Sequence, residues 1–171
     1  MPNWCWNSVR ITGETSEIER LLGRVRRSED GGVTLLGTYY PCPDELMDSP
    51  SPAHLPRAEE MTEKYGSPDW YSWCSENWGT KWSECQMHIQ YEKGSNTALL
   101  DFDTAYAPPL TGYAEISKQF PSLIFEFYYE EPGCAFCGDA RIVNGEVEDD
   151  CRDYIDEDAE DEEDEYDSDV A

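Results

Sequence analysis

The sequence has few basic residues. Its 171 residues hold 12 Lys and Arg and two His against 38 Asp and Glu, which gives a formal net charge of −26. A protein this negative is repelled by nucleic acid and by anionic membrane surfaces, so we expect it to bind neither directly. The charge instead favours a partner protein with a basic surface.

The sequence also lacks any segment suited to a membrane. No apolar stretch approaches the roughly 20 residues that span a bilayer. The N-terminal Met1–Trp6 segment has neither the basic region nor the apolar region of a signal peptide. We therefore expect a cytoplasmic protein without membrane contact.

Signatures of catalysis are missing as well. There is no Gly-rich phosphate loop, no Gly-x-Ser-x-Gly segment and no His pair at metal-binding spacing. Asp101 and Asp103 fall on one face of an expected strand and resemble a catalytic carboxylate pair. Such pairs arise by chance in so acidic a chain and usually face solvent. We expect a binding protein without a cofactor and not an enzyme.

The seven cysteines form an odd number, which favours free thiols over a disulfide framework and suits a reducing compartment. Cys134 and Cys137 have the one spacing typical of a metal or redox site. A structural zinc site normally needs four ligands, and the two His residues lie far apart in the sequence. Free thiols are the first interpretation, and a small zinc-binding protein that uses Cys134 and Cys137 is an alternative.

Acidic residues are concentrated at the C-terminal end. From Glu146 onward the chain has sixteen acidic residues and one basic residue, Arg152. Such a segment repels itself and has little apolar surface to bury, so it does not offset the entropy cost of ordering. The chain as a whole is 39% hydrophobic, which is enough for a core. We expect one domain over residues 1–148, with a Pro-rich insertion at about 48–68, and a disordered acidic tail over 149–171.

Patterns typical of strands alternate with patterns typical of helices along this domain. Strands are expected over residues 6–13, 33–40, 84–91, 97–105, 123–129 and 140–147, the last with a turn at Asn144-Gly145. Helices are expected after the N-cap residue Ser16, over 58–65, over 69–79 and after Pro108–Pro109. Cys85, Met87 and Ile89 should share one face of their strand. The order predicts an α+β fold, a ferredoxin-like antiparallel sheet with helices packed mainly on one face.

Four segments resemble a known family. They are Met1-Pro2-Asn3-Trp4-Cys5, Glu76-Asn77-Trp78-Gly79-Thr80-Lys81-Trp82, Thr104-Ala105-Tyr106-Ala107-Pro108-Pro109 and Glu130-Glu131-Pro132-Gly133. In this order they resemble the YubB ferredoxin-like domain family of bacteriophages and conjugative plasmids, over roughly residues 1–148, with the Pro-rich insertion and the tail outside the shared pattern. The resemblance implies the fold and an origin on a mobile element, and it carries over no catalytic residue.

The acidic tail supplies the first set of candidate binding residues. Its carboxylates could occupy a Lys- and Arg-rich surface of a host protein, such as a defence or nucleic-acid-handling factor. They would stand in for nucleic-acid phosphates and block that protein. The alternative is a tail that only increases solubility. The candidate residues are Asp156, Glu157, Asp158, Glu160, Asp161, Glu162, Glu163, Asp164 and Glu165.

Trp78 and Trp82 are the second set. They could form an exposed aromatic docking surface, which would make the protein a general interaction module whose charge is incidental. Alternatively, both side chains complete the core and Gly79 ends a helix with a positive φ.

Overall fold

Six strands form one antiparallel sheet that supports the rest of the chain. The computed structural model describes residues 2–27 and 33–154, so the acidic run at 156–165 lies outside the described residues. In order across the sheet, the strands are β4 (Cys85–Gln90), β5 (Thr97–Ala105), β1 (Trp4–Thr12), β6 (Ile124–Glu131), β7 (Phe136–Val143) and β8 (Glu146–Asp153).

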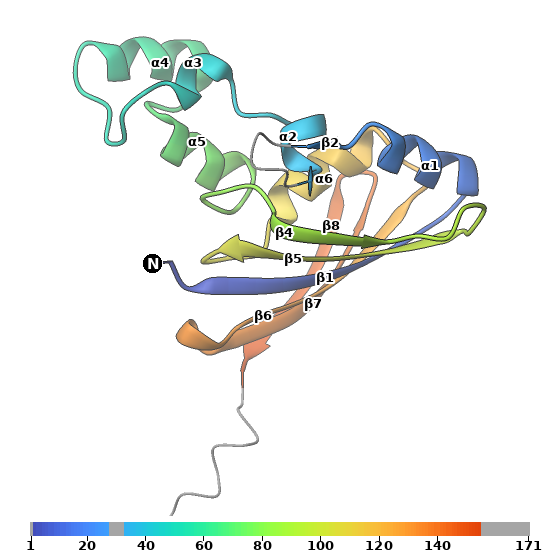
Figure 1. Ribbon diagram of the computed structural model, residues 1–171. Coiled ribbons are helices and arrows are strands. Elements are labelled where there is room, and N and C mark those ends of the chain that lie inside the picture. The colour runs from blue at the N-terminus through green and yellow to red at the C-terminus, as the bar shows by residue number, and fades with distance from the viewer. Residues whose placement is uncertain (1, 28–32, 155–171) are drawn as a thin grey trace, which may run out of the picture.

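The helices gather on one side of this sheet, and α3 to α5 extend past one of its corners (Figure 1). A separate pair of two-residue strands, β2 (Arg26–Arg27) and β3 (Val33–Thr34), connects α1 to α2. This arrangement confirms the expected α+β, ferredoxin-like architecture. The helices are α1 (Thr15–Gly23), α2 (Leu36–Tyr39), α3 (Asp44–Met47), α4 (Arg57–Tyr65), α5 (Trp70–Asn77), α6 (Leu110–Lys118) and the short η1 (Pro132–Cys134).

Strict alternation along β1 gives the sheet a covered and an open face. Val9 and Ile11 are fully buried, whereas Arg10 between them and Trp6 earlier in the strand are exposed. On the covered face, Tyr113 of α6 stacks on the Phe102 ring with centroids 5.9 Å apart. The apolar residues of the strands and helices meet there in one core.

The prediction of a strand over residues 33–40 is wrong. Its β-branched and aromatic residues form only the two-residue β3 before the chain turns into α2. The cause is a carboxylate distant in sequence: Glu84 accepts hydrogen bonds from the backbone N–H groups of Leu35 (3.2 Å) and Leu36 (3.1 Å) and from the Tyr113 hydroxyl (2.9 Å). These bonds satisfy backbone N–H groups that have no partner within the helix at its first turn, and they therefore favour a helix over a strand here.

The prediction that Cys85 and Met87 share one face of their strand is also wrong. The β4–β5 register shifts between Cys85 and His88, and Gln86 between them has a φ of 53°. This is a β-bulge, which inserts one extra residue and reverses the alternation beyond it. Met87 therefore points into the core while Cys85 lies on the other side of the sheet.

Several boundaries also differ from expectation. Helix α1 begins at Thr15 after the N-cap residue Glu14, so Ser16 lies inside it. The boundary placed after residue 148 falls within β8, because the β7–β8 ladder pairs Phe136 with Asp153. In the Pro-rich segment the expected helix is present as α4, one residue longer at its start. No helix in residues 2–27 and 33–154 is long and apolar enough to cross a membrane.

Glu84 makes a testable contribution to stability. Burial raises the pKa of its carboxyl group from 4.5 to about 7, although the hydrogen bonds from Tyr113, Leu36 and Leu35 oppose the rise. The folded state therefore binds this proton more tightly than the unfolded state. As pH rises through the interval from 4.5 to about 7, the free energy of unfolding falls, and it levels off above that interval.

We expect Glu84→Gln to remove this pH dependence. Between about pH 5 and about pH 8, the difference in unfolding free energy between the original protein and the variant should change by about 2 kcal/mol. Urea unfolding across that range measures it. Glu63→Gln, which replaces an exposed carboxylate on α4, should follow the original protein at every pH, and a constant difference for Glu84→Gln would contradict the assignment.

Candidate functional site

The open face of the sheet carries polar residues in rows that cross the strands. One row can be followed through the ladder registers from β4 to β8: His88, Asp101, Ser8, Tyr128, Asp139 and Asp150. Each residue lies opposite the next, so their side chains are close enough to interact. Acidic residues that are scattered in the sequence therefore share one surface.

We call the carboxylates of this surface the acidic face. Eight acidic residues on β5 to β8 face outward here against three arginines, Arg10, Arg141 and Arg152. Arg141 lies 4.0 Å from Glu148, and Arg152 pairs with Asp139 and lies 3.8 Å from Asp150. These surface pairs leave a net negative face. The acidic face consists of Asp101, Asp103, Glu126, Glu130, Asp139, Glu146, Glu148 and Asp150.

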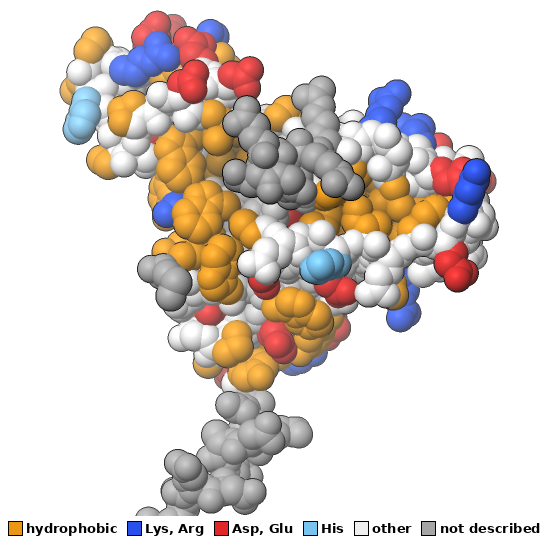
Figure 2. Space-filling view, viewed as in Figure 1, with side chains coloured by type: hydrophobic (Ala, Val, Ile, Leu, Met, Phe, Trp, Pro, Cys, Tyr) orange, Lys and Arg blue, Asp and Glu red, His pale blue; other side chains and the backbone are white. Residues whose placement is uncertain are grey.

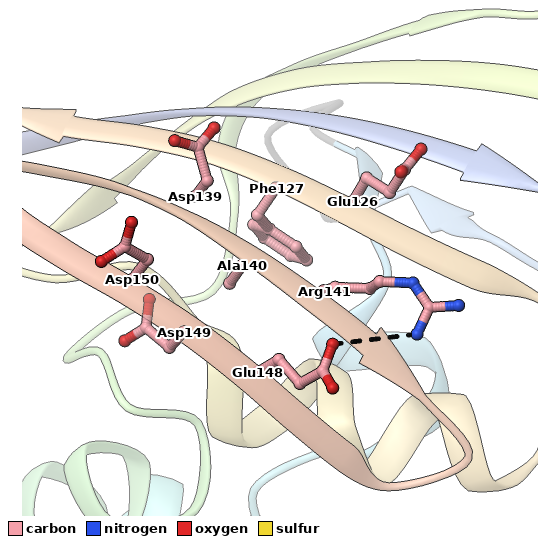
Figure 3. A pocket seen from close by; sticks show the side chains of 8 residues that line it. All are labelled: Glu126, Phe127, Asp139, Ala140, Arg141, Glu148, Asp149 and Asp150. Atoms are coloured by element: carbon pink, nitrogen blue, oxygen red, sulfur yellow. Dashed lines mark ion pairs between the residues drawn. The ribbon is translucent and has the colours of Figure 1, made fainter.

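A shallow hollow of about 380 Å³ lies over β6, β7 and β8. Figure 3 shows the carboxylates of Asp139, Asp149 and Asp150 on one side of it and the Arg141–Glu148 ion pair on the other. Phe127 and Ala140 also line it. The hollow offers mainly oxygen acceptors, so it can receive cationic side chains from a partner.

The strand at the edge of this surface is entirely exposed. Every residue of β8 from Glu146 to Asp153 is open to solvent, and no strand within residues 2–27 and 33–154 pairs with its outer backbone groups. Charges on an edge strand discourage pairing with another sheet. The same charges form a border of carboxylates at the point where the described chain ends.

Trp78 and Trp82 differ in burial. Trp78 is 5% exposed and donates its indole N–H to the Tyr40 carbonyl oxygen at 2.8 Å, which makes it part of the core. Trp82 is partly exposed, and its ring centroid lies 6.0 Å from that of Trp4. The core interpretation thus holds for Trp78, with Gly79 at a φ of 85°, and the surface interpretation suits Trp82.

The loop from Gly79 to Glu84 presents Trp82 beside Lys81. A β-carbon added at Gly79 would lie 3.3 Å from the Pro108 carbonyl oxygen. Thr80 is buried, and its hydroxyl donates to the Ala105 carbonyl oxygen at 2.8 Å. With Glu84 fixed at the other end, the loop holds Lys81 and Trp82 at the β4 edge of the sheet.

Behind this loop lies a second cavity, the aromatic pocket, of about 390 Å³. Helices α3 and α5 supply one wall, and the 79–84 loop and β4 supply the other. Figure 2 shows hydrophobic side chains gathered on this side of the molecule, below the corner formed by α3 and α4. The pocket is lined by Met47, Trp70, Cys74, Trp78, Lys81, Trp82, Ser83 and Cys85.

Cys134 and Cys137 do not come together with further ligands. Cys134 is exposed and accepts a hydrogen bond from the Asn3 side-chain amide at 3.4 Å, while Cys137 is buried beside the Asp153 carbonyl at 3.9 Å. Among the residues that the structure describes, no group of three His, Cys, Asp or Glu is placed to hold a metal ion. The catalytic pair considered from the sequence, Asp101 and Asp103, lies on the acidic face.

Two features were missed in the sequence: the acidic face and the aromatic pocket at Lys81. The alternation of Glu126, Tyr128 and Glu130 was a signal for the first, since alternate residues of a strand share a face. Nothing in the sequence brings α3 and α5 to Lys81, because that contact depends on the path of the chain through the Pro-rich segment.

The burial of the thiols predicts their reactivity. Cys134 and Cys151 are exposed, whereas Cys5 and Cys74 are 0% and 1% exposed, and burial raises the pKa of the Cys5 thiol to about 12. We expect iodoacetamide to alkylate Cys134 and Cys151 in the folded protein, and Cys5 and Cys74 only after urea is added. Peptide mass spectrometry measures each site.

The same labelling tests the zinc alternative. A zinc ion bound by Cys134 would protect this thiol and leave Cys151 reactive, because thiolate ligands are held by the metal. Equal alkylation of Cys134 with and without added zinc would rule the alternative out. Alkylation of Cys5 in the native protein at the rate of Cys151 would contradict the burial.

Comparison with known proteins agrees with this fold. One relative, the uncharacterized protein YubB of Escherichia coli (strain K12), is 36% identical over 86 residues, which are 49% of this chain and 58% of the relative. The match thus spans little more than half of the relative's length. The crystal structure of a protein api92 from Yersinia pseudotuberculosis superposes with a TM-score of 0.58 over 91% of this chain and 99% of that one. At 14% identity it supports the fold alone.

A family model described as a ferredoxin-like domain in Api92-like protein matches residues 72–169. The matched region begins well inside the domain and runs beyond residue 148, so the acidic tail, expected outside the shared pattern, is largely within it. More than half of the 171 residues are matched, and this confirms the family resemblance seen in the sequence. The chain belongs to the family of Api92-like proteins with a ferredoxin-like domain.

Proposed function

We propose that this protein is a non-enzymatic accessory protein that binds a basic surface of a host protein through carboxylates. The acidic face and the exposed edge strand β8 form the described part of the binding surface. The tail carboxylates from Asp156 to Glu165 extend it in sequence. By occupying Lys and Arg side chains that would otherwise contact phosphates, the protein would inhibit a defence or nucleic-acid-handling factor.

The observation that carries the proposal is the gathering of carboxylates on one exposed surface. Glu126 and Glu146 have no hydrogen-bond or ion-pair partner among the described residues, so a partner's cations could approach them without first breaking a contact. Asp139 and Asp150 stand beside an open hollow (Figure 3). Carboxylates on two or three adjacent strands can contact a row of basic side chains together.

Electrostatics would act mainly on recognition and rate. A net charge of −26 attracts a basic partner over distances limited by the Debye length, about 8 Å at physiological ionic strength. Attraction of this kind raises the association rate and weakens steeply with salt. A complex held by apolar contacts would show little of this dependence.

The origin and location belong to the same proposal. The family resemblance suggests a phage or conjugative-plasmid protein, which would act in the cytoplasm of a bacterial host cell. The relative YubB is described only as uncharacterized, so the proposal rests on this chain's own charge and surface.

Affinity capture from a bacterial host lysate tests the proposal. The bait is the full chain, used at low and at moderate salt, beside a variant that combines Glu126→Gln, Glu148→Gln and Asp150→Asn. We expect the full chain to retain a nucleic-acid-binding protein at low salt, with a loss of about tenfold in affinity for the variant. Added DNA should compete for that protein.

The matched control combines Glu59→Gln, Glu63→Gln and Glu92→Gln, which remove the same charge from exposed positions away from the acidic face. If the control loses as much affinity as the acidic-face variant, net charge and not this surface is responsible. A partner that is retained equally by all three baits and resists salt would show that the acidic face does not mediate binding. Edge protection would then be sufficient to explain the charges on β8.

A further inference from the structure

The aromatic pocket has the dimensions of a ligand site. Its volume of about 390 Å³ lies within the range of roughly 300 to 1,000 Å³ that holds small organic molecules. Trp70, Trp78 and Trp82 line it together with Met47. Met47 is 51% exposed and stands at an open side of the cavity, so a ligand can reach the pocket without a movement of the fold.

Lys81 gives this apolar pocket a positive charge. Its ammonium nitrogen lies 4.6 Å from the Trp82 ring centroid, 5.6 Å from Tyr71 and 6.0 Å from Trp70. Contacts with ring faces hold a cation in place by electrostatic attraction to the aromatic quadrupole. The rings therefore fix the position of the ammonium group and provide no formal negative charge to neutralise it.

No carboxylate among the described residues forms an ion pair with Lys81. The contrast with neighbouring helices is informative, because Arg57 and Lys64 of α4 both pair with Glu45 of α3. In a chain with 38 acidic residues, an unpaired lysine at the wall of an aromatic cavity leaves its charge available to a ligand. The complementary ligand group is an anion.

We infer that the aromatic pocket binds a small organic anion, with its apolar body between the tryptophan side chains and its carboxylate against Lys81. The apolar body would gain from leaving water, at roughly 25 cal/mol per Å² of buried surface. The carboxylate would gain a charge-assisted hydrogen bond from the ammonium group. The pocket is separate from the β6–β8 part of the acidic face, and this binding does not depend on the partner proposed for that face.

Three probes with one apolar body separate the contributions. Phenylbutyrate carries the anion, phenylbutyramide is neutral, and phenylbutylamine is cationic. Titration of the full chain, followed by calorimetry and by tryptophan fluorescence, measures each affinity. We expect phenylbutyrate to bind at least about tenfold more tightly than the amide, because a hydrogen bond to a charged group is worth about that factor. The amine should bind most weakly.

Lys81→Met tests the role of the charge, since methionine keeps an unbranched apolar side chain at the pocket wall. The variant should bind phenylbutyrate and the amide within about threefold of each other, and Lys81→Arg should restore the preference for the anion. Lys93→Met, at an exposed turn residue, is the matched control and should behave like the original protein. Thermal unfolding of each variant confirms that the fold is retained.

Two results would overturn the inference. One is equal affinity of the original protein for the anion, the amide and the amine, or no binding of any probe at millimolar concentration. The other is a preference for phenylbutyrate that persists in Lys81→Met, which would place the anion elsewhere. Neither result bears on the acidic face, and the charge variants of that face should bind phenylbutyrate as the original protein does.

Discussion

A single buried carboxylate connects the elements on which the aromatic pocket depends. Glu84 lies immediately before β4, and it accepts hydrogen bonds from the start of α2 and from Tyr113 of α6. Helix α2 then packs so closely on α6 that a β-carbon at Gly112 would lie 2.3 Å from Leu36 and 3.2 Å from Trp78. The position of Trp78, and with it one wall of the aromatic pocket, follows from this arrangement.

Burying a carboxylate costs free energy unless hydrogen bonds compensate it. Here three donors converge on one side chain, yet burial still raises its pKa to about 7. The cost is accepted because the same group satisfies backbone donors that would otherwise be buried without partners. Hydrogen bonds to particular backbone N–H groups specify one arrangement of the chain more narrowly than apolar packing does. Here they determine that the turn at Leu35 and Leu36 lies against the start of β4.

Elements governed by local patterns could be predicted from the sequence, and elements governed by distant contacts could not. Strand β5, Asp69 as the N-cap of α5, and Pro109 before α6 follow from side-chain alternation, capping and backbone restriction. Residues 33–40 have strand propensity, but Glu84 imposes a turn on them, and the bulge at Gln86 has no signal in residue type. The strand β8 was missed because its stability comes from pairing with β7 rather than from apolar side chains.

The candidate sites follow the same division, and their separation has a physical consequence. The negative net charge predicted an acidic binding surface, but the register of five strands was needed to define which residues form it. The aromatic pocket lies at the β4 edge, whereas Glu148 and Asp150 lie on β8. Five strand spacings of about 4.8 Å place them roughly 24 Å apart, about three Debye lengths at physiological ionic strength. Asp101 and Asp103 on β5 are nearer, so these two carboxylates, rather than the net charge, would oppose an anion held by Lys81.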